Sequence, residues 1–187
     1  MLWVFTATEE LLPVIVFFVV QQLYNFKAGL VAMTLLVIVF LAVSYLFAKA
    51  IPRFALFSTI ALLSFSVPSI VTGHSTYFQI SDTILDGFFA VLLLGSWTSR
   101  FLILKYLFDR VFAITDEAWR ILSLRWGVLF LVLAILNEYV RLGYSEDVWA
   151  TYKLVSTMGV LAFGCYQFTL SARMRIPSES NRLGLRS

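Results

Sequence analysis

Long apolar segments separated by short polar ones make up most of this chain. The clearest covers residues 28–48, where Thr34 and Ser44 are the only polar side chains and no residue is charged. At about 1.5 Å of rise per residue, a helix over this segment reaches about 30 Å, the thickness of a bilayer's hydrocarbon core. Four further segments have a similar character, residues 54–72, 78–97, 121–140 and 148–170. The pattern predicts an all-α, polytopic transmembrane helix bundle with about five full spans.

A shorter apolar segment precedes these spans, over residues 11–24. Its length of about 14 residues is marginal for a full crossing, and Pro13 fits the first turn of a helix. We therefore expect a short N-terminal apolar helix, tilted or re-entrant, with a full span as the competing interpretation. No cleavable signal peptide is predicted, because Glu9 and Glu10 come before this segment and the first basic residue is Lys27.

Two prolines interrupt the pattern. Pro52 marks a tight turn between the first two long spans. Pro68 lies near the end of the next span and is expected to kink it, because proline removes a backbone hydrogen bond. Ser64 and Ser66 are placed to satisfy the backbone groups that Pro68 leaves without partners.

The connection over residues 100–112 is too apolar for a free loop and too charged to span. A bend near Gly95 followed by an interfacial helix explains it, and a cytoplasmic extension of the preceding span is the alternative. After it, Thr115, Asp116 and Glu117 are expected to start a new helix, because acidic groups are favoured at a helix N-terminus. Trp119 and Trp126 are expected to bracket the cytoplasmic interface.

Basic residues are distributed unequally between the two sides of the predicted bundle. One side has only Lys27, Arg141 and Lys153. The other side holds the remaining eleven of the 14 Lys and Arg residues, namely Lys49, Arg53, Arg100, Lys105, Arg110, Arg120, Arg125, Arg173, Arg175, Arg182 and Arg186. Because cytoplasmic loops are enriched in Lys and Arg, this second side and the C-terminus are expected to face the cytoplasm. The side of the N-terminus stays open, because it depends on whether residues 11–24 cross.

Composition agrees with a membrane protein. The chain is 60% hydrophobic and 13% charged, with a mean hydropathy of +0.89, outside the range of ordinary soluble domains. We divide it into one integral membrane helix bundle, residues 1–176, and a polar cytoplasmic tail, residues 177–187, predicted to be disordered. The net charge of +3 does not indicate nucleic-acid binding, because the basic residues lie beside apolar spans, where orientation explains them.

Ionisable residues inside spans are the candidates for a functional site. Asp82 and Asp86 are four residues apart and share one helical face, with Asp86 near the expected midplane. Glu138 and Lys153 fall in the outer layer of two neighbouring antiparallel helices and are expected to pair. The side chains expected to complete this polar cluster are Gln21, Gln22 and Asn137. The cluster is read either as a small pocket or lipid-headgroup site, or as an internal network that holds the helices together.

No catalytic motif is present in the sequence. It contains no HExxH, no GxSxG and no Gly-rich phosphate loop, and no carboxylates at metal-ligand spacing. His74 is the only histidine and lies in a short turn, and Cys165, the only cysteine, is expected to be an inert buried packing residue. We therefore predict no enzyme activity, no cofactor and no metal site.

Several motifs in the second half of the chain resemble one known family. They are Leu104-Lys105-Tyr106-Leu107, the stretch from Thr115 to Trp119, Leu124-Arg125-Trp126, Asn137-Glu138, and Trp149 followed by Tyr152-Lys153, with a weaker Leu12-Pro13 to Phe17-Phe18 pattern. In this order they resemble the YciB family, also called intracellular septation protein A, of bacterial inner membranes. The likeness spans nearly the whole chain and is strong over residues 100–154.

The resemblance implies a multi-pass inner-membrane protein concerned with cell-envelope biogenesis, membrane homeostasis and septation. Glu138 and Lys153 match the family pattern and are the site residues it implies. The chain departs from that pattern at Ser81-Asp82-Thr83, where the family tends to carry Lys-Pro-Thr, and at Gln22 and Asn25, where it carries charged residues.

Two functions follow as hypotheses. The first is a non-enzymatic protein that supports envelope integrity and division through membrane lipids and partner proteins of envelope synthesis or cell division. The second is a small transporter or lipid-handling protein with its polar site in the outer half of the bundle. Transporters usually show internal repeats or interrupted helices, and only Asp86 and Pro68 point that way here.

Overall fold

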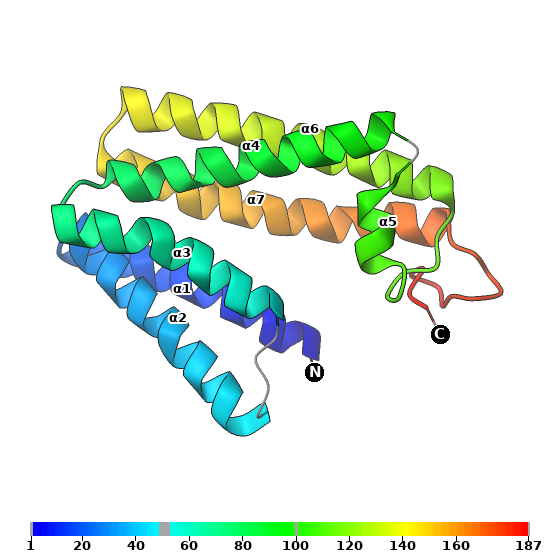
Figure 1. Cartoon of the computed structure of the whole chain (residues 1–187), viewed down its shortest axis with the longest axis horizontal. Coiled ribbons are helices and arrows are strands. Elements are labelled where there is room, and N and C mark those ends of the chain that lie inside the picture. Colours follow the sequence, from blue (N-terminus) through cyan, green and yellow to red (C-terminus); the bar gives the residue numbers. More distant parts are fainter. Residues whose placement is uncertain (1, 49–52, 100, 187) are drawn as a thin grey trace. The chain divides into compact units, whose positions relative to one another are not determined.

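The computed structural model describes residues 2–48, 53–99 and 101–186, and helices account for most of them (Figure 1). The helices are α1 (Leu2–Leu23), α2 (Phe26–Ala48), α3 (Arg53–Thr72), α4 (Thr76–Thr98), α5 (Ile103–Phe108), α6 (Asp116–Gly143) and α7 (Glu146–Arg173). Among the described residues, α2, α4, α6 and α7 are long and apolar enough to cross a membrane. The prediction of an all-α polytopic helix bundle is confirmed.

The N-terminal helix is longer than predicted. It begins at Leu2 rather than near residue 11, so Pro13 lies inside α1 and not in its first turn. The prediction was wrong because hydropathy marks where a helix is apolar, and α1 continues through the polar residues before its apolar part. That apolar part, Leu12–Leu23, is as short as expected, and its crossing of the membrane stays a prediction.

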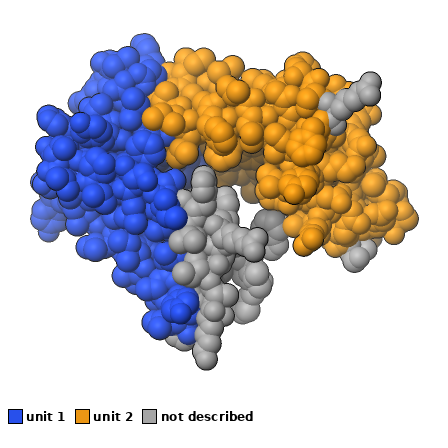
Figure 2. Space-filling view, in the orientation of Figure 1, with its two compact units in different colours: residues 1–81, 137–157 blue, residues 82–136, 158–187 orange. Residues whose placement is uncertain are grey.

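The chain divides into two compact units (Figure 2). Unit 1 consists of Met1–Ser81 and Asn137–Thr157, and unit 2 consists of Asp82–Leu136 and Met158–Ser187. The long helices α4, α6 and α7 are each divided between the units, with one end in unit 1 and the rest in unit 2. This division does not follow the boundary between residues 176 and 177 that the sequence suggested.

In unit 1, α1 packs against α2 and α2 packs against α3. A glycine allows the first contact, because a Cβ atom at Gly29 would lie 2.7 Å from the Phe17 carbonyl oxygen and 2.9 Å from the Gln21 Cβ. Small residues let membrane helices approach closely enough for their backbones to touch. The α1–α2 contact is of this kind.

In unit 2, α6 is central to the packing. A Cβ atom at Gly127 would lie 2.8 Å from the Leu94 side chain of α4, and Trp126 meets Phe163 of α7 edge to face, with ring centroids 5.0 Å apart. Trp119 is buried and packs edge to face on Phe112. The Trp119 ring therefore fills the core of this unit, and its expected place at the level of the cytoplasmic interface stays a prediction.

The segment between α4 and α6 forms the separate helix α5, so a continuous extension of α4 is excluded. The break comes after Thr98 rather than near Gly95. Ser96 makes it possible, since its hydroxyl accepts the Ile103 N–H at 2.9 Å and donates to the Phe101 carbonyl at 3.0 Å. Helix α6 begins at Asp116 as predicted, and the Thr115 hydroxyl accepts the Ala118 N–H at 3.3 Å.

The C-terminal tail pairs with the segment before α6 instead of being disordered. The Ala113 N–H donates to the Gly184 carbonyl at 3.0 Å, and the Arg186 N–H donates to the Val111 carbonyl at 2.8 Å. Gly184 has a φ of 81°, and a Cβ atom there would lie 2.7 Å from the Ser171 carbonyl oxygen. Glycine is needed at this position both for its backbone conformation and for the close approach.

The expectations for the two prolines and for the cysteine have different outcomes. Pro52 lies outside the described residues. Within α3 the Ser64 hydroxyl donates to the Ile60 carbonyl at 2.8 Å and does not serve the backbone next to Pro68, while the buried Ser66 hydroxyl has no hydrogen-bond partner in the part of the chain that the structure describes. Cys165 is exposed rather than buried.

Candidate functional site

Four aromatic rings from four helices meet in the core of unit 1. They are Phe17 of α1, Phe26 of α2, Phe78 of α4 and Trp149 of α7, which we call the aromatic cluster. Each ring contacts the other three, with centroids between 5.4 Å and 6.3 Å apart. Such pairs contribute about 0.5–1.5 kcal/mol each beyond the burial of their area. The cluster therefore holds the ends of these four helices together.

A buried amide lies beside this cluster. Asn137 of α6 is fully buried, and its Nδ2 donates to the Gln79 carbonyl of α4 at 2.9 Å. Its Oδ1 accepts a hydrogen bond from Trp149 Nε1 at 2.8 Å. Because both ends of the amide are used, Asn137 fixes the orientation of the Trp149 indole and ties α4, α6 and α7 together.

A second polar contact joins α1 to the start of α7. Gln21 is buried, and its Nε2 donates to Asp147 Oδ1 at 2.7 Å. The hydrogen bond is charge-assisted, which makes it stronger than one between neutral groups. Gln21 and Gln22 were both expected in the polar cluster, and of the two Gln21 makes this buried contact while Gln22 is exposed.

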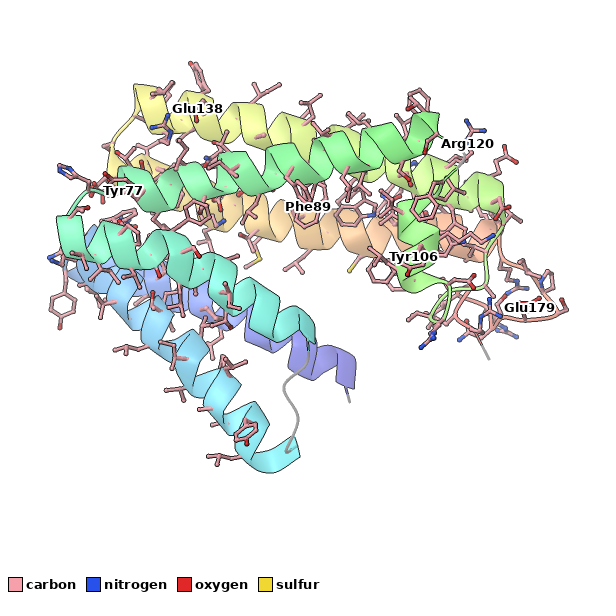
Figure 3. The ribbon with its side chains drawn as sticks, viewed as in Figure 1. Tyr77, Phe89, Tyr106, Arg120, Glu138 and Glu179 are labelled. Carbon is pink, nitrogen blue, oxygen red and sulfur yellow. The ribbon has the colours of Figure 1, made fainter. Side chains whose placement is uncertain are left out.

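Glu138 lies in the last turns of α6, near the connection to α7 (Figure 3). Arg141, one turn later on the same helix, donates to it from Nε at 3.1 Å and also from Nη2. The sequence analysis used Arg141 only to assign the sides of the membrane and so missed this partner. The predicted pairing of Glu138 with Lys153 stays a prediction.

The structure distributes the predicted site residues over both units. Asn137, Glu138 and Lys153 belong to unit 1, whereas Asp82 and Asp86 belong to unit 2. Trp149 and Asp147 also contribute to the site in unit 1, and neither was among the candidates. The resemblance pointed to Trp149, but no periodicity in the sequence marks its hydrogen bond to Asn137.

An open cavity of about 270 Å³ lies at the same end of unit 1. Its lining comes from the start of α2 and the residue before it, from the end of α3, from the connection between α3 and α4, and from the start of α7. It consists of Asn25, Phe26, Lys27, Ser69, Gly73, Ser75 and Glu146. Gly73, with a φ of 75°, turns the chain between α3 and α4. Phe26 is shared with the aromatic cluster, so the cavity adjoins the packed core.

Within the described residues, no three His, Cys, Asp or Glu side chains come together as metal ligands. His74 is exposed in the α3–α4 connection, as expected. The polar side chains Asn137 and Gln21 bond to Trp149 and Asp147, respectively, and in this arrangement they hold helices in place.

Comparisons with known proteins agree on one family. The family model described as intracellular septation protein A matches residues 6–175. The inner membrane-spanning protein YciB of Bradyrhizobium sp. strain BTAi1 is 32% identical over 166 residues, which cover 89% of this chain and 79% of the relative. The protein of the same name from Afipia carboxidovorans is 32% identical over 174 residues, covering 92% and 86%. The one from Agrobacterium fabrum is 37% identical over 120 residues, covering 64% and 59%. No solved structure matches the chain significantly.

Proposed function

The chain belongs to the intracellular septation protein A family, and from this membership we propose that it supports cell-envelope biogenesis, membrane homeostasis and septation without catalysing a reaction. The relatives are named inner membrane-spanning proteins, and this chain has several helices long and apolar enough to cross a membrane. In this proposal the protein lies in the inner membrane with its C-terminus in the cytoplasm. It acts through membrane lipids and through neighbouring membrane proteins of envelope synthesis or cell division.

The observation that carries the non-enzymatic part of the proposal is the engagement of Asn137. A catalytic or transport site needs polar groups that reach a substrate, whereas this buried amide donates to the Gln79 carbonyl and accepts from Trp149. Asp147, at the start of α7, is likewise bound by Gln21. These contacts support a rigid framework in unit 1 that presents fixed surfaces to lipids and partners.

Complementation tests the proposal. Cells that lack this protein are expected to show irregular division and reduced survival of a hypo-osmotic shift, and the wild-type chain is expected to restore both. A variant with Asn137→Leu, at normal protein level, should restore them poorly, while a variant at the exposed tail residue, Arg182→Gln, should restore them fully. If cells without the protein divide and survive the shift like their parent, the proposed function is wrong.

The second candidate function, a lipid-handling protein, is favoured by one observation. The cavity beside the aromatic cluster opens to the outside of unit 1 and is lined by side chains of both charges, Lys27 and Glu146. The same complementation strain tests it, since a lipid-handling role requires Lys27→Gln or Glu146→Gln to impair rescue without lowering protein level.

A further inference from the structure

Two opposite charges line the cavity of unit 1 without neutralising each other. Lys27 and Glu146 are both exposed at its surface, and neither forms an ion pair within the described part of the chain. We propose that this cavity binds a zwitterion made of a phosphate and a primary ammonium group, the headgroup of phosphatidylethanolamine. This inference rests on the proposal that the protein acts through membrane lipids, and it names the lipid class.

The phosphate is assigned to the side of Lys27. This residue lies in the first turn of α2, where backbone N–H groups have no partner inside the helix and the helix dipole favours negative charge. Asn25 caps the helix by accepting the Ala28 N–H at 2.8 Å, and Asn25, Phe26 and Lys27 at this helix start all line the cavity. An ammonium and a helix N-terminus together form a common arrangement for binding phosphate.

The ammonium group is assigned to the side of Glu146. Its carboxylate is in the first turn of α7, across a lining that also contains Ser69 and Ser75. A primary ammonium donates three hydrogen bonds, which a carboxylate and nearby hydroxyl or carbonyl oxygens accept. A trimethylammonium group cannot donate, so the chemistry of this side selects ethanolamine over choline.

Apolar side chains next to the cavity supply a place for the acyl chains. Leu23 is 71% exposed, Tyr24 76% and Val71 77%, and each lies within two residues of a residue that lines the cavity. In a bilayer, exposed apolar side chains contact acyl chains, and the chains of a lipid whose headgroup binds at the cavity would lie against these three residues. The proposed function places this surface at the membrane, where phosphatidylethanolamine is a source of the zwitterion, and the test below includes the soluble headgroup as the alternative source.

Native mass spectrometry of the full chain in detergent micelles tests the inference. The probes are phosphatidylethanolamine, phosphatidylcholine and phosphatidylglycerol with identical acyl chains. We expect phosphatidylethanolamine to bind at least about tenfold more tightly than the other two, as one charge-assisted hydrogen bond allows. Lys27→Gln and Glu146→Gln should each abolish this preference, whereas the matched controls Arg182→Gln and Glu117→Gln, at exposed positions in unit 2, should keep it.

The outcomes separate the possible explanations. Equal affinity for the three lipids, or a preference that survives both cavity variants, overturns the inference. Competition by free phosphoethanolamine at equal strength keeps the zwitterion site but assigns it to a soluble ligand rather than a lipid. Because binding is measured on the isolated protein, a failure here is independent of the complementation result that tests the proposed function.

Discussion

Asn137 joins three helices of unit 1 through one side-chain amide. Replacing it with leucine removes the acceptor of Trp149 Nε1, and it removes the second donor to the Gln79 carbonyl, which keeps its partner inside α4. A buried polar group left without its partner costs about 1–3 kcal/mol, and Asn137→Leu should therefore destabilise the protein by about 1–3 kcal/mol. Thermal unfolding in detergent micelles measures this loss.

The control for Asn137→Leu is Gln22→Leu, at an exposed position, which should change the unfolding temperature little. Removing the indole N–H at the same time, in Asn137→Leu with Trp149→Phe, should cost less than the sum of the two single changes. Full additivity would mean that the hydrogen bond between Asn137 and Trp149 contributes nothing to stability.

For single residues, the sequence predicted the members of the polar site better than it predicted their contacts. Asn137 was a candidate from its depth in a span and from the family motif, but its partner Trp149 is twelve positions away across a connection. Both Gln21 and Gln22 were candidates for the polar cluster, and only Gln21 is buried. The apolar part of α1, Leu12–Leu23, has apolar residues on every side, so the sequence does not mark which face is buried.

Helix α1 approaches α2 most closely at Gly29. Gly29→Ala would place a Cβ atom 2.7 Å from the Phe17 carbonyl oxygen, and backbone atoms cannot move away as a flexible side chain does. We expect a loss of about 1–3 kcal/mol, typical of overpacking. Gly159→Ala in α7 is the matched control, because a Cβ atom there meets nothing within 4 Å. If thermal unfolding gives the same unfolding temperature for Gly29→Ala and Gly159→Ala, the tight α1–α2 contact is contradicted.

The tail is held to the segment before α6 by backbone pairing that depends on Gly184. Gly184→Val combines a strained positive φ with a Cβ atom 2.7 Å from the Ser171 carbonyl oxygen. We expect the tail to detach and trypsin to cleave after Arg182 about tenfold faster, because proteolysis follows the open population. Leu183→Val, at an exposed neighbour, should leave the cleavage rate unchanged, and equal rates in both variants would rule out the dependence on Gly184.

Hydropathy predicted the positions of the long helices, because a bilayer sets their length. It did not predict where the helices end or how the C-terminal tail is held. The break after Thr98 depends on local hydrogen bonds of Ser96 that hydropathy ignores, and the start of α1 lies in a stretch that includes the polar residues Glu9 and Glu10. The tail was predicted to be disordered from its polar composition. Its order comes from backbone pairing, to which side-chain polarity is a poor guide.

At the scale of the whole molecule, the arrangement of the connections bears on how the chain crosses the membrane. Asn25 after α1, Gly73 after α3 and Glu146 after α6 all line one cavity in unit 1. The connections that the charge asymmetry assigns to the outer side are therefore neighbours in space, as alternate crossings of one bilayer require. This grouping fits an alternation of crossings in either orientation, so the choice between the two sides rests on the count of basic residues alone.

Cysteine labelling tests that orientation directly in a Cys165→Ser background, which removes the only native thiol. His74 and Ser178 are both exposed, so a cysteine at either position is accessible to a reagent in water. With eleven basic residues on the second side against three on the first, we expect His74→Cys to react with a membrane-impermeant maleimide in intact spheroplasts. Ser178→Cys should react only after the membrane is opened, since the C-terminus then lies in the cytoplasm. The reverse pattern would invert every crossing, and it would place the Lys27–Glu146 cavity on the cytoplasmic leaflet.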